Sequence, residues 1–548
     1  MYGIFFFIPH LRLFSHFRMS NCDEIVTIIR KKRMGERYMN ESVFNLVRNK
    51  NLQDKIVTAE EAALWIEHDM TLGLSGFTRA GDAKAIPMAL VERAKREKSL
   101  FKVNVFTGAS LGPEVDHFMA EAGIINKRLP FQADSSMRSK INSGEIVYID
   151  QHLSHTAELI RNEILEEIDF AIIEALAITE DGMIIPTTSL GNSAIFAQRA
   201  KNIIIELNVS HSGSLEGIHD VYLPAKQGER EPIPLTKVDD RIGTIGIPVD
   251  IEKIKGVVVT FQPDASSTIV PPDEETQEIA DHLLTLLREE IKAGRLTEKL
   301  APLQSGIGSV ANAVFHGFLD SEFTELEVYS EVLQDAVFDL LDAGKVRFAS
   351  GCSITLSEEK GHQVYQNLDQ YRDKLVLRPQ EISNSPEIIR RLGLISINTA
   401  VECDIYGNVN STHICGTKMM NGIGGSGDFA RNAGLSIFVT KSIAKHGAVS
   451  SIVPFASHVD HTEHDVDVII TEQGYADLRG LSPRERVHVI INNCSHPMYR
   501  KQLMDYFEEA LERGGQTPHV LEKAFSWHTN FAKNGTMLQE EGQLTGKH

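Results

Sequence analysis

The strongest constraint on the fold is an alternation of short apolar runs with segments of helical spacing between Ile56 and Thr260. The runs TLGLSGF, LFKVNVFTG, FAIIEAL and NIIIELN are typical of buried strands, whereas IPMALVERAKRE and HTAELIRNEIL have the pattern of helices. A second series of the same kind extends from about Ser305 to Thr471. This alternation predicts an α/β fold with mostly parallel sheets.

A segment rich in proline, aspartate and serine separates the two series. It reads FQPDASSTIVPPDEETQ, from Phe261 to Gln277, and leads into a predicted helix around IADHLLTLLREEI. The chain has 548 residues, which is more than one hydrophobic core supports. We therefore predict two α/β domains of similar size, residues 39–260 and residues 261–548.

The first 38 residues do not share the α/β pattern. The apolar run in MYGIFFFIPHLRLF is too short to span a membrane, and it has neither a basic segment before it nor a cleavage site after it. The basic stretch Arg30–Arg33 would suit a transit peptide, but Asp23, Glu24 and Glu36 argue against one. We interpret residues 1–38 as an extension or a mis-called start before Met39. No other segment has a long uncharged apolar run, so we expect no transmembrane helix and no membrane partner.

Charge and cysteine content exclude some classes of partner. The formal net charge is −20, which makes nucleic acid an unexpected partner because phosphate binding needs clustered positive charge. The five cysteines are scattered and show no C-x-x-C spacing. We therefore expect no disulfide framework and no zinc site, and we predict a reducing, cytoplasmic location.

Glu331 lies in LEVYSEVLQDAVFDLLDAGKV, where the spacing of apolar residues changes. The residues from Leu326 to Glu331 alternate as in a strand, and helical spacing follows from Val332 until Gly344 closes the helix. Glu331 thus stands where a strand ends and a helix begins. Ligands of open α/β sheets bind outside the carboxyl ends of strands. The alternative is that Glu331 only complements the helix N-terminus.

The segment QSGIGSVANAVFHGF contains a G-x-G-x-x-A pattern at Gly306, Gly308 and Ala311. With Glu331 about 20 residues further on, this resembles a dinucleotide fingerprint, but the preceding LTEKLAPLQ does not have the pattern of a buried strand. The narrower inference is that these glycines let backbone N–H groups approach an anion or a developing oxyanion. The alternative is a plain loop with a helix N-cap at Ser309.

A second glycine cluster lies in TKMMNGIGGSGDFARNA. Ser426 lies in Gly424-x-Ser426-x-Asp428, which lacks the final glycine of a nucleophile elbow, so Ser426 is a poor candidate for a serine nucleophile. Each glycine costs conformational entropy, and close approach of the backbone to a ligand explains the cluster better than a simple turn.

Three histidines and a second strand-end carboxylate lie in SHVDHTEHDVDVIITEQG. His458, His461 and His464 are three residues apart, but VDVIITEQG has the pattern of a strand, so the histidines are predicted to lie on a loop. No known zinc spacing matches, and we predict no metal site. Glu472, at the end of that strand, is placed as Glu331 is.

Two further features complete the motif set. Asn384 precedes Ser385-Pro386, which predicts a turn and a helix start. The segment GLISINTAVECDIYGNVN predicts a hairpin with Tyr406–Asn408 at its turn.

Taken together, these ordered motifs resemble the acetyl-CoA hydrolase/transferase family of class I CoA-transferases, and most closely its succinyl-CoA:acetate branch. GLSGFTRAGDAKAIP, VFTGASLGPEVD, QSGIGSVANAV, YSEVLQDAVFDLLDAGKVRFAS, EISNSPEIIRRLG, GGSGDFARNA and VDHTEHDVDVIITEQGYADLRGLSP all carry the resemblance, from about Lys55 to beyond Pro483. The resemblance implies two α/β domains with the active site between them, usually in a homodimer.

The resemblance also implies roles for individual residues. Glu331 matches the nucleophile that becomes a glutamyl-CoA thioester, and Asn384 and Glu472 match residues that flank it. The backbone N–H groups of Ile307 and Gly425 match an oxyanion hole. The positions that match CoA contacts are Ser305, Gly306, Ile307, Gly308, Ser309, Val401, Asn421, Gly425 and Lys445. No tightly bound cofactor is implied, because coenzyme A is a substrate and becomes a covalent intermediate.

The chemistry fits such a site. Glutamate has a reference pKa of about 4.3, so it is expected to be ionised at neutral pH and to attack a thioester without a His/Asp base. The predicted function is transfer of CoA between a short-chain acyl-CoA (succinyl-CoA or acetyl-CoA) and a free acid (acetate or succinate), through an acyl-glutamyl anhydride and the thioester.

Several alternatives remain open at the level of sequence. An acetyl-CoA hydrolase would use the same glutamate with water as acceptor, and a propionyl-CoA:succinate or butyrate-type transferase would differ only in its pocket. A non-catalytic CoA or nucleotide sensor would tolerate the loss of Glu331. A nicotinamide-dependent dehydrogenase would bind its cofactor at Gly306 and Gly308.

Overall fold

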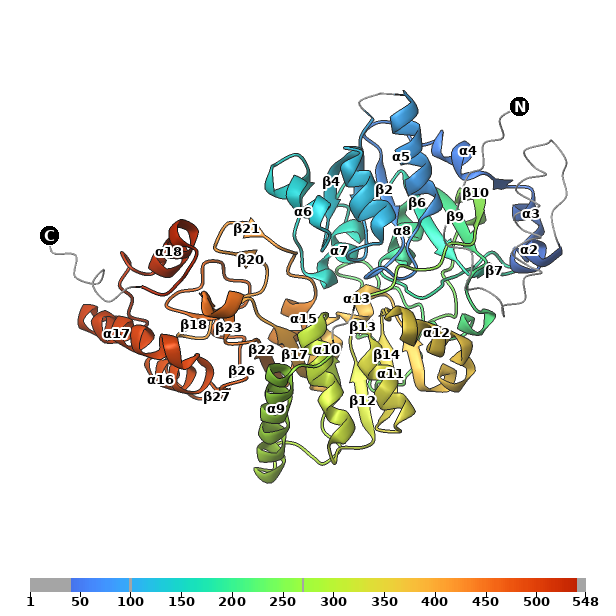
Figure 1. The fold of residues 1–548 in the computed structure, drawn as a ribbon. Coiled ribbons are helices and arrows are strands. Elements are labelled where there is room, and N and C mark those ends of the chain that lie inside the picture. The colour runs from blue at the N-terminus through green and yellow to red at the C-terminus, as the bar shows by residue number, and fades with distance from the viewer. Residues whose placement is uncertain (1–40, 98–100, 269–270, 540–548) are drawn as a thin grey trace, which may run out of the picture.

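The computed structural model describes residues 41–97, 101–268 and 271–539, and the predicted extension of residues 1–38 lies outside these ranges. The described chain forms two α/β domains, each built around an eight-stranded sheet (Figure 1). None of the described helices is both long and apolar enough to cross a membrane.

The N-terminal sheet has the strand order β1-β10-β9-β6-β2-β3-β4-β5, and every neighbouring pair is parallel. The four strands predicted from apolar runs are confirmed, because their aliphatic side chains are buried on both faces of the sheet. The strands are β1 (Ile56–Val57), β2 (Thr71–Leu74), β3 (Val103–Phe106), β4 (Ile125–Leu129), β5 (Val147–Tyr148), β6 (Phe170–Ala175), β9 (Asn202–Asn208) and β10 (Ile254–Thr260).

Helices cover this sheet, and a small hairpin of β7 (Ala177–Ile178) and β8 (Ile184–Ile185) stands apart from it. The two predicted helices are confirmed as α5 and α7, although α7 ends at Arg161, before the apolar pair that follows. The helices are α2 (Glu41–Leu46), α3 (Lys50–Gln53), α4 (Ala59–Ala63), α5 (Ala85–Glu97), α6 (Ser135–Asn142), α7 (Leu153–Arg161) and α8 (Ser193–Arg199).

The C-terminal sheet has the order β16-β14-β12-β11-β17-β22-β26-β27 and is parallel except for β27 at its edge. The strands are β11 (Leu303–Ser305), β12 (Leu326–Tyr329), β14 (Val346–Gly351), β16 (Leu375–Leu377), β17 (Ile395–Thr399), β22 (Leu435–Val439), β26 (Val468–Thr471) and β27 (Gly474–Asp477). The predicted hairpin is confirmed only for β18 (Glu402–Asp404) and β19 (Val409–Asn410), since Ile395–Thr399 belongs to the central sheet.

The helix predicted after the linker is confirmed as α9, which begins with a capping box at Asp273. Pro386 opens α14, as the Ser-Pro pair after Asn384 predicts. The helices of this part are α9 (Glu274–Lys292), α10 (Ser309–His316), α11 (Asp335–Asp342), α12 (Glu358–Gln366), α13 (Gln380–Ser383), α14 (Pro386–Leu392), α15 (Ser426–Asn432), α16 (Pro483–Cys494), α17 (Pro497–Arg513) and α18 (Ser526–Asn534).

One prediction and one alternative at the first glycine loop are wrong. A buried strand, β11, does precede Gly306, and it lies in the middle of the sheet. It has no apolar run because Gln304 is polar inside the sheet, where its side chain exchanges hydrogen bonds of 3.2 Å with Asn398. The N-cap of α10 is Gly308 and not Ser309.

The helix after Glu331 also begins later than predicted. Val332 belongs to β13 (Val332–Leu333), which pairs with β15 (Ser353–Ile354), and α11 starts at Asp335. The strand of Leu326–Tyr329 and the closing glycine are confirmed, since Gly344 has φ +68° after the helix end. Residue 331 is thus held between two short strands.

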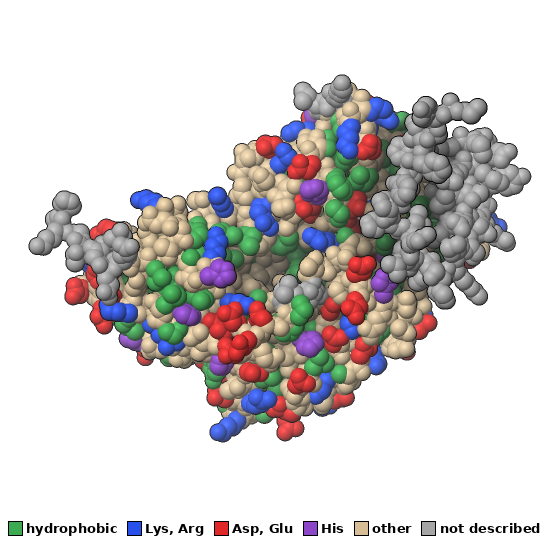
Figure 2. Space-filling model, viewed as in Figure 1, with side chains coloured by type: hydrophobic (Ala, Val, Ile, Leu, Met, Phe, Trp, Pro, Cys, Tyr) green, Lys and Arg blue, Asp and Glu red, His purple; other side chains and the backbone are tan. Residues whose placement is uncertain are grey.

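The two domains pack through α7, α13 and α15. The side-chain amide of Gln380 donates to the carbonyl of Leu153 at 2.9 Å, and Arg161 forms an ion pair with Glu381 at 2.6 Å. A small apolar cluster joins the domains beside residue 331, and it consists of Phe77, Ala109, Leu153, Val332 and Cys352. Between the lobes the visible surface is hollowed (Figure 2).

Candidate active site

Glu331 follows the carboxyl end of β12, next to β11 in the centre of the C-terminal sheet. Its carbonyl accepts hydrogen bonds from the backbone N–H groups of Cys352 at 2.6 Å and Ser353 at 3.1 Å. The residue is 4% exposed. The backbone therefore fixes a buried carboxylate where the domains meet.

The carboxylate of Glu331 has an abnormal environment. Burial raises its pKa, a hydrogen bond from the side-chain amide of Asn384 to Oε1 lowers it, and the nearby carboxylate of Asp428 raises it, to about 7. The expectation of a fully ionised glutamate, which rests on the ordinary pKa, therefore needs correction. Near neutral pH, Glu331 exchanges between a reactive carboxylate and a neutral acid.

Gly425 lies against this carboxylate. A Cβ atom at position 425 would overlap Oε1 of Glu331 and Nδ2 of Asn384, so only glycine fits there. Within the described chain, the N–H groups of Gly425 and Ile307 have no protein acceptor. Two free backbone donors in glycine loops are suited to an oxyanion, and the role of these two groups as an oxyanion hole stays a prediction.

The first glycine loop is braced by Gln334, a residue that sequence reasoning missed. The amide of Gln334 donates to the carbonyl of Gly306 at 3.0 Å and accepts from the N–H of Gly308 at 3.4 Å. Gly308 has φ +115°, which favours glycine. The hydroxyl of Ser330 also donates to the carbonyl of Ser305 at 3.0 Å, so the loop is tied to the strand end that carries Glu331.

The other predicted CoA contacts lie on separate loops. The N–H of Val401 donates to the carbonyl of Asn410, and the side-chain amide of Asn421 donates to the carbonyl of Gly422 at 2.9 Å. Lys445 is exposed, with φ +50° and its ammonium 4.6 Å from the centre of the Phe531 ring. Their contact with CoA stays a prediction.

Glu472 lies at the end of β26, as predicted, but it does not contact Glu331. Its carboxylate accepts hydrogen bonds from the N–H of Ser442 at 2.8 Å and from the Ser442 hydroxyl. Of the predicted catalytic set, the structure brings Glu331, Asn384 and Gly425 together. Among the described contacts, neither Glu472 nor Ile307 forms a hydrogen bond with any of these three.

Asp428 and Ser154 are two site residues that sequence reasoning did not find. Asp428 is 4% exposed and lies in the first turn of α15. It accepts from the Ser154 hydroxyl at 2.6 Å and from the Ser154 N–H at 3.0 Å, and one of its oxygens lies 3.4 Å from Nδ2 of Asn384. The only signal in the sequence was an aspartate beside a glycine cluster, in a pattern read as an incomplete nucleophile elbow.

The three spaced histidines lie on a loop, as predicted, and face different neighbours. His458 stacks on His413, with ring centres 3.8 Å apart, while His464 is exposed. His461 is buried, which lowers its pKa to about 4, and its Nε2 lies 3.1 Å from the hydroxyl of Ser426. These rings do not converge on one point.

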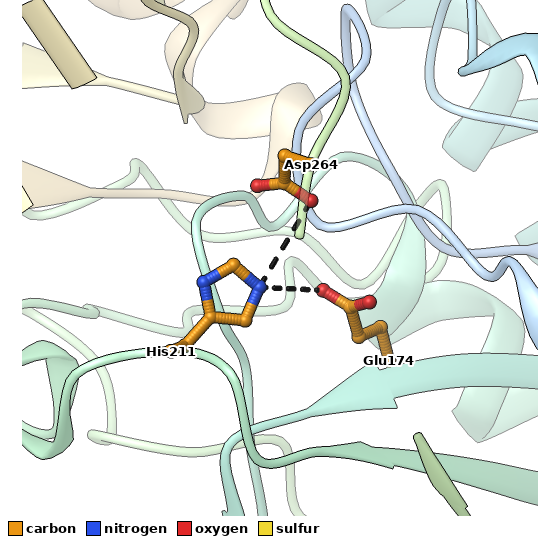
Figure 3. A group of neighbouring side chains, drawn as sticks. All are labelled: Glu174, His211 and Asp264. Atoms are coloured by element: carbon orange, nitrogen blue, oxygen red, sulfur yellow. Dashed lines mark hydrogen bonds and ion pairs between the residues drawn. The ribbon is translucent and has the colours of Figure 1, made fainter. Parts of the chain in front are cut away.

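A different set of metal-ligating groups converges in the N-terminal domain. Glu174, His211 and Asp264 point toward one another, with His211 Nε2 3.2 Å from Glu174 and 3.9 Å from Asp264 (Figure 3). The ammonium of Lys84 also lies 2.7 Å from Glu174 and 2.9 Å from Asp264. A side-chain cation already occupies the position among these oxygens.

Comparison with known families agrees with this geometry. Residues 40–259 match the acetyl-CoA hydrolase/transferase N-terminal domain, and residues 361–507 match the acetyl-CoA hydrolase/transferase C-terminal domain.

Three curated relatives are similar over nearly their whole length. A succinyl-CoA:acetate CoA-transferase from Clostridium kluyveri is 52% identical over 90% of this chain and 91% of its own. A propanoyl-CoA:succinate CoA transferase from Escherichia coli is 44% identical over 88% of this chain and 98% of its own. An acetyl-CoA hydrolase from Yarrowia lipolytica is 44% identical over 90% of this chain and 98% of its own.

Solved structures share the fold at lower identity. RipA from Yersinia pestis is 23% identical with a TM-score of 0.66, covering 84% of this chain and 98% of its own. A 4-hydroxybutyrate CoA-transferase from Porphyromonas gingivalis is 20% identical with a TM-score of 0.57, covering 83% of this chain and 98% of its own. With two matched domains, relatives of this identity and a shared CoA-transferase fold, the chain belongs to the acetyl-CoA hydrolase/transferase family.

Proposed function

We propose that the protein transfers CoA between a short-chain acyl-CoA and a free carboxylic acid, with Glu331 as the covalent nucleophile. Succinyl-CoA or acetyl-CoA is the proposed donor, and acetate or succinate the acceptor. The observation that carries the proposal is a buried carboxylate at a strand end, against the glycine loop at Gly425, whose backbone N–H has no acceptor within the described chain. The 52% identical relative from Clostridium kluyveri, a succinyl-CoA:acetate CoA-transferase, supports this choice of acids.

The reaction proceeds by two exchanges at Glu331. Its ionised carboxylate attacks the thioester carbonyl carbon, a C–O bond forms, the C–S bond breaks, and CoA leaves as a thiolate. The thiolate then attacks Cδ of Glu331, which forms the glutamyl-CoA thioester and releases the first acid as a carboxylate. The second acid reverses these steps. Donors at the tetrahedral oxyanion are worth about 3–4 kcal/mol each, and the N–H groups of Ile307 and Gly425 would supply them.

Burial of the nucleophile favours transfer over hydrolysis. The mixed anhydride hydrolyses readily if water enters, and a site that is 4% exposed limits that entry. Acetyl-CoA hydrolysis is the second candidate, because a relative at 44% identity is an acetyl-CoA hydrolase. The two activities share Glu331 and differ in what attacks the covalent intermediate: a second carboxylate, which ends as the new acyl-CoA, or water, which releases free CoA.

Trapping of the intermediate tests the nucleophile. Incubation with succinyl-CoA or acetyl-CoA and no added acid, followed by borohydride, should convert one glutamate, Glu331, to an alcohol that peptide mass spectrometry locates. Glu331→Ala should lose the label and nearly all transfer. Glu331→Asp should lose about 100-fold, because a side chain one methylene shorter misplaces the carboxylate by about 1 Å.

The result that contradicts the proposal is a label on another residue, or full transfer by a folded Glu331→Ala protein. A CoA sensor without catalysis predicts that second result. Mass spectrometry of CoA exchange between succinyl-, acetyl- and propionyl-CoA and their free acids, with released acid measured in parallel, separates the acid pair and the hydrolase alternative. Sedimentation of the active protein tests the predicted homodimer.

A further inference from the structure

The nucleophile has a second buried carboxylate as its neighbour, and no cation compensates the pair. In the described chain, no lysine or arginine forms an ion pair with Glu331 or Asp428. The groups that face them are Asn384, Ser154 and Cys352, and His152 lies against Gly427, the residue before Asp428. Burial raises the pKa of the Cys352 thiol and lowers the pKa of His152, so both are uncharged near neutral pH.

The two carboxylates are not equally well solvated. Asp428 receives hydrogen bonds from the hydroxyl and the N–H of Ser154 and shares the amide of Asn384. From the residues that the structure describes, the carboxylate of Glu331 receives only the bond from Asn384. Hydrogen-bond donors favour the ionised form of an acid, but burial still raises the pKa of Asp428 to about 7. Above that pH Asp428 is ionised, and its charge opposes the ionisation of Glu331.

Resting on the proposed function, we propose that Asp428 is a positioning residue that orients Asn384 and drives Glu331 toward its neutral, CoA-bearing form. Conversion of Glu331 to a thioester removes the negative charge from that side chain and places it on the released acid. Repulsion from Asp428 is present in the free enzyme and absent in the thioester. The repulsion from Asp428 raises the free energy of the ionised free enzyme but not that of the thioester. It therefore shifts the equilibrium toward the thioester by the same free energy with which it opposes the ionisation of Glu331.

The contact with Ser154 makes this effect depend on both domains. Ser154 lies in the first turn of α7 in the N-terminal domain, and Asp428 lies in α15 of the C-terminal domain. Ser154 stabilises the charged form of Asp428, so it sets how much negative charge faces Glu331 near neutral pH.

The test is the Asp428→Asn variant, which removes the charge and keeps the size of the side chain. Two quantities are measured with acetyl-CoA: the pH dependence of the rate of thioester formation at Glu331, and the fraction of thioester at equilibrium with a fixed acid concentration at pH 8. The acid limb of the rate should move to lower pH by about one unit, and the thioester fraction should fall toward about one-tenth. The Kd for CoA should stay unchanged.

Ser154→Ala provides the second variant in case Asp428→Asn does not fold. Without Ser154, Asp428 holds its proton to higher pH, so the same two shifts are expected with smaller size. Asp404→Asn is the matched control, because Asp404 is also fully buried but binds Asn408 and the Tyr406 N–H away from Glu331.

An unmoved acid limb with an unchanged thioester fraction, in either folded variant, would overturn the role of Asp428 and reduce it to packing. If the variant reacts more slowly but the acid limb and the thioester fraction stay unchanged, Asp428 likewise has only a packing role. If the unmodified enzyme forms no thioester at Glu331, the proposed function itself fails, and this outcome is distinct from the other two.

Discussion

Two buried carboxylate clusters, one in each domain, differ in a single component. Glu174 lies on β6 beside Asp264, and the ring of His211 points toward both carboxylates (Figure 3). The ammonium of Lys84 forms ion pairs with the same two acids. Burial would raise the pKa of Glu174, but Lys84 and His211 lower it to about 2. Glu331 is equally buried with only neutral donors and a second acid, and its pKa rises to about 7.

Glu174 and Glu331 are both buried, but their pKa values shift in opposite directions, so burial alone does not make a carboxylate reactive. Glu174 is a permanent anion that binds its cation and stabilises the loop carrying Lys84. Glu331 has no such cation among the described residues. Any step that neutralises its carboxylate therefore lowers the free energy of the site. The reactivity of Glu331 therefore depends on the absence of a cation among its described neighbours.

Removal of the cation should have the largest effect. Lys84→Met leaves the buried Glu174 and the partly buried Asp264 without their ammonium, and such a loss costs about 3–5 kcal/mol of the free energy of unfolding. Urea denaturation at pH 7.5 measures it. The matched control is Lys95→Met, because Lys95 pairs with Glu92 on the exposed face of α5 and such pairs contribute less than about 1 kcal/mol. Equal stability of the two variants would show that Lys84 compensates nothing.

Removal of the reactive charge should stabilise the fold. The pKa of Glu331 is raised in the folded state, so the native protein loses stability as pH rises from its ordinary value near 4.3 to about 7. Glu331→Gln escapes this loss, and its free energy of unfolding at pH 8 should exceed that of the unmodified protein by about 1–3 kcal/mol.

The matched change in the other cluster should act with the opposite sign. The pKa of Glu174 is lowered, so its stabilisation is present above its ordinary pKa and is lost as pH falls toward about 2. Glu174→Gln should thus be less stable than the unmodified protein at pH 8. Urea denaturation at pH 5 and pH 8 measures the free energy of unfolding of Glu331→Gln and Glu174→Gln. If both variants were stabilised at pH 8, or both destabilised, the difference between the two clusters would be contradicted.

Glu472 is an intermediate case, a buried carboxylate with neutral donors but no second acid in contact. Glu472→Ala leaves the N–H of Ser442 unpaired, which costs about 1–3 kcal/mol of the free energy of unfolding, and it should slow turnover without abolishing it. Borohydride labelling should still locate the thioester at Glu331. Loss of the label from a folded variant that binds CoA would mean that Glu472 is the nucleophile.

Removal of metal ions is expected to have no effect on turnover. Because Lys84 fills the only convergent group of metal-ligating side chains found in the described chain, chelation of the active enzyme should leave its turnover unchanged. Elemental analysis of the same sample should find no stoichiometric metal. A bound metal whose removal stops turnover would show that the histidine loop or the cluster at Glu174 holds an ion.

The sequence predicted the strands whose side chains are apolar on both faces, such as β6 and β9, because period and burial agree there. It failed at β11, where Gln304 and Asn398 satisfy each other inside the sheet and no apolar run is needed. The placement of Glu331 and Glu472 at strand ends followed from local periodicity alone.

Contacts across the domain interface could not be predicted from the local periodicity of the sequence. Asn384 was placed beside Glu331 only through the family resemblance, since 53 residues separate them in the chain. Asp428 and Ser154 are 274 residues apart, and their contact exists only because α7 packs against α15. A single sequence carries periodicity, but it does not carry the docking of two domains.

The pair of Ser154 and Asp428 gives the order of synthesis a chemical meaning. The ribosome delivers the N-terminal domain first, so α7 is complete before Glu331 and Asp428 emerge. Until the later strands and α15 have been made, Glu331 lacks the glycine loop of Gly425 and the neighbouring carboxylate of Asp428. The surroundings of the nucleophile are therefore completed only by the last part of the chain to be made, when it packs against the domain that was made first.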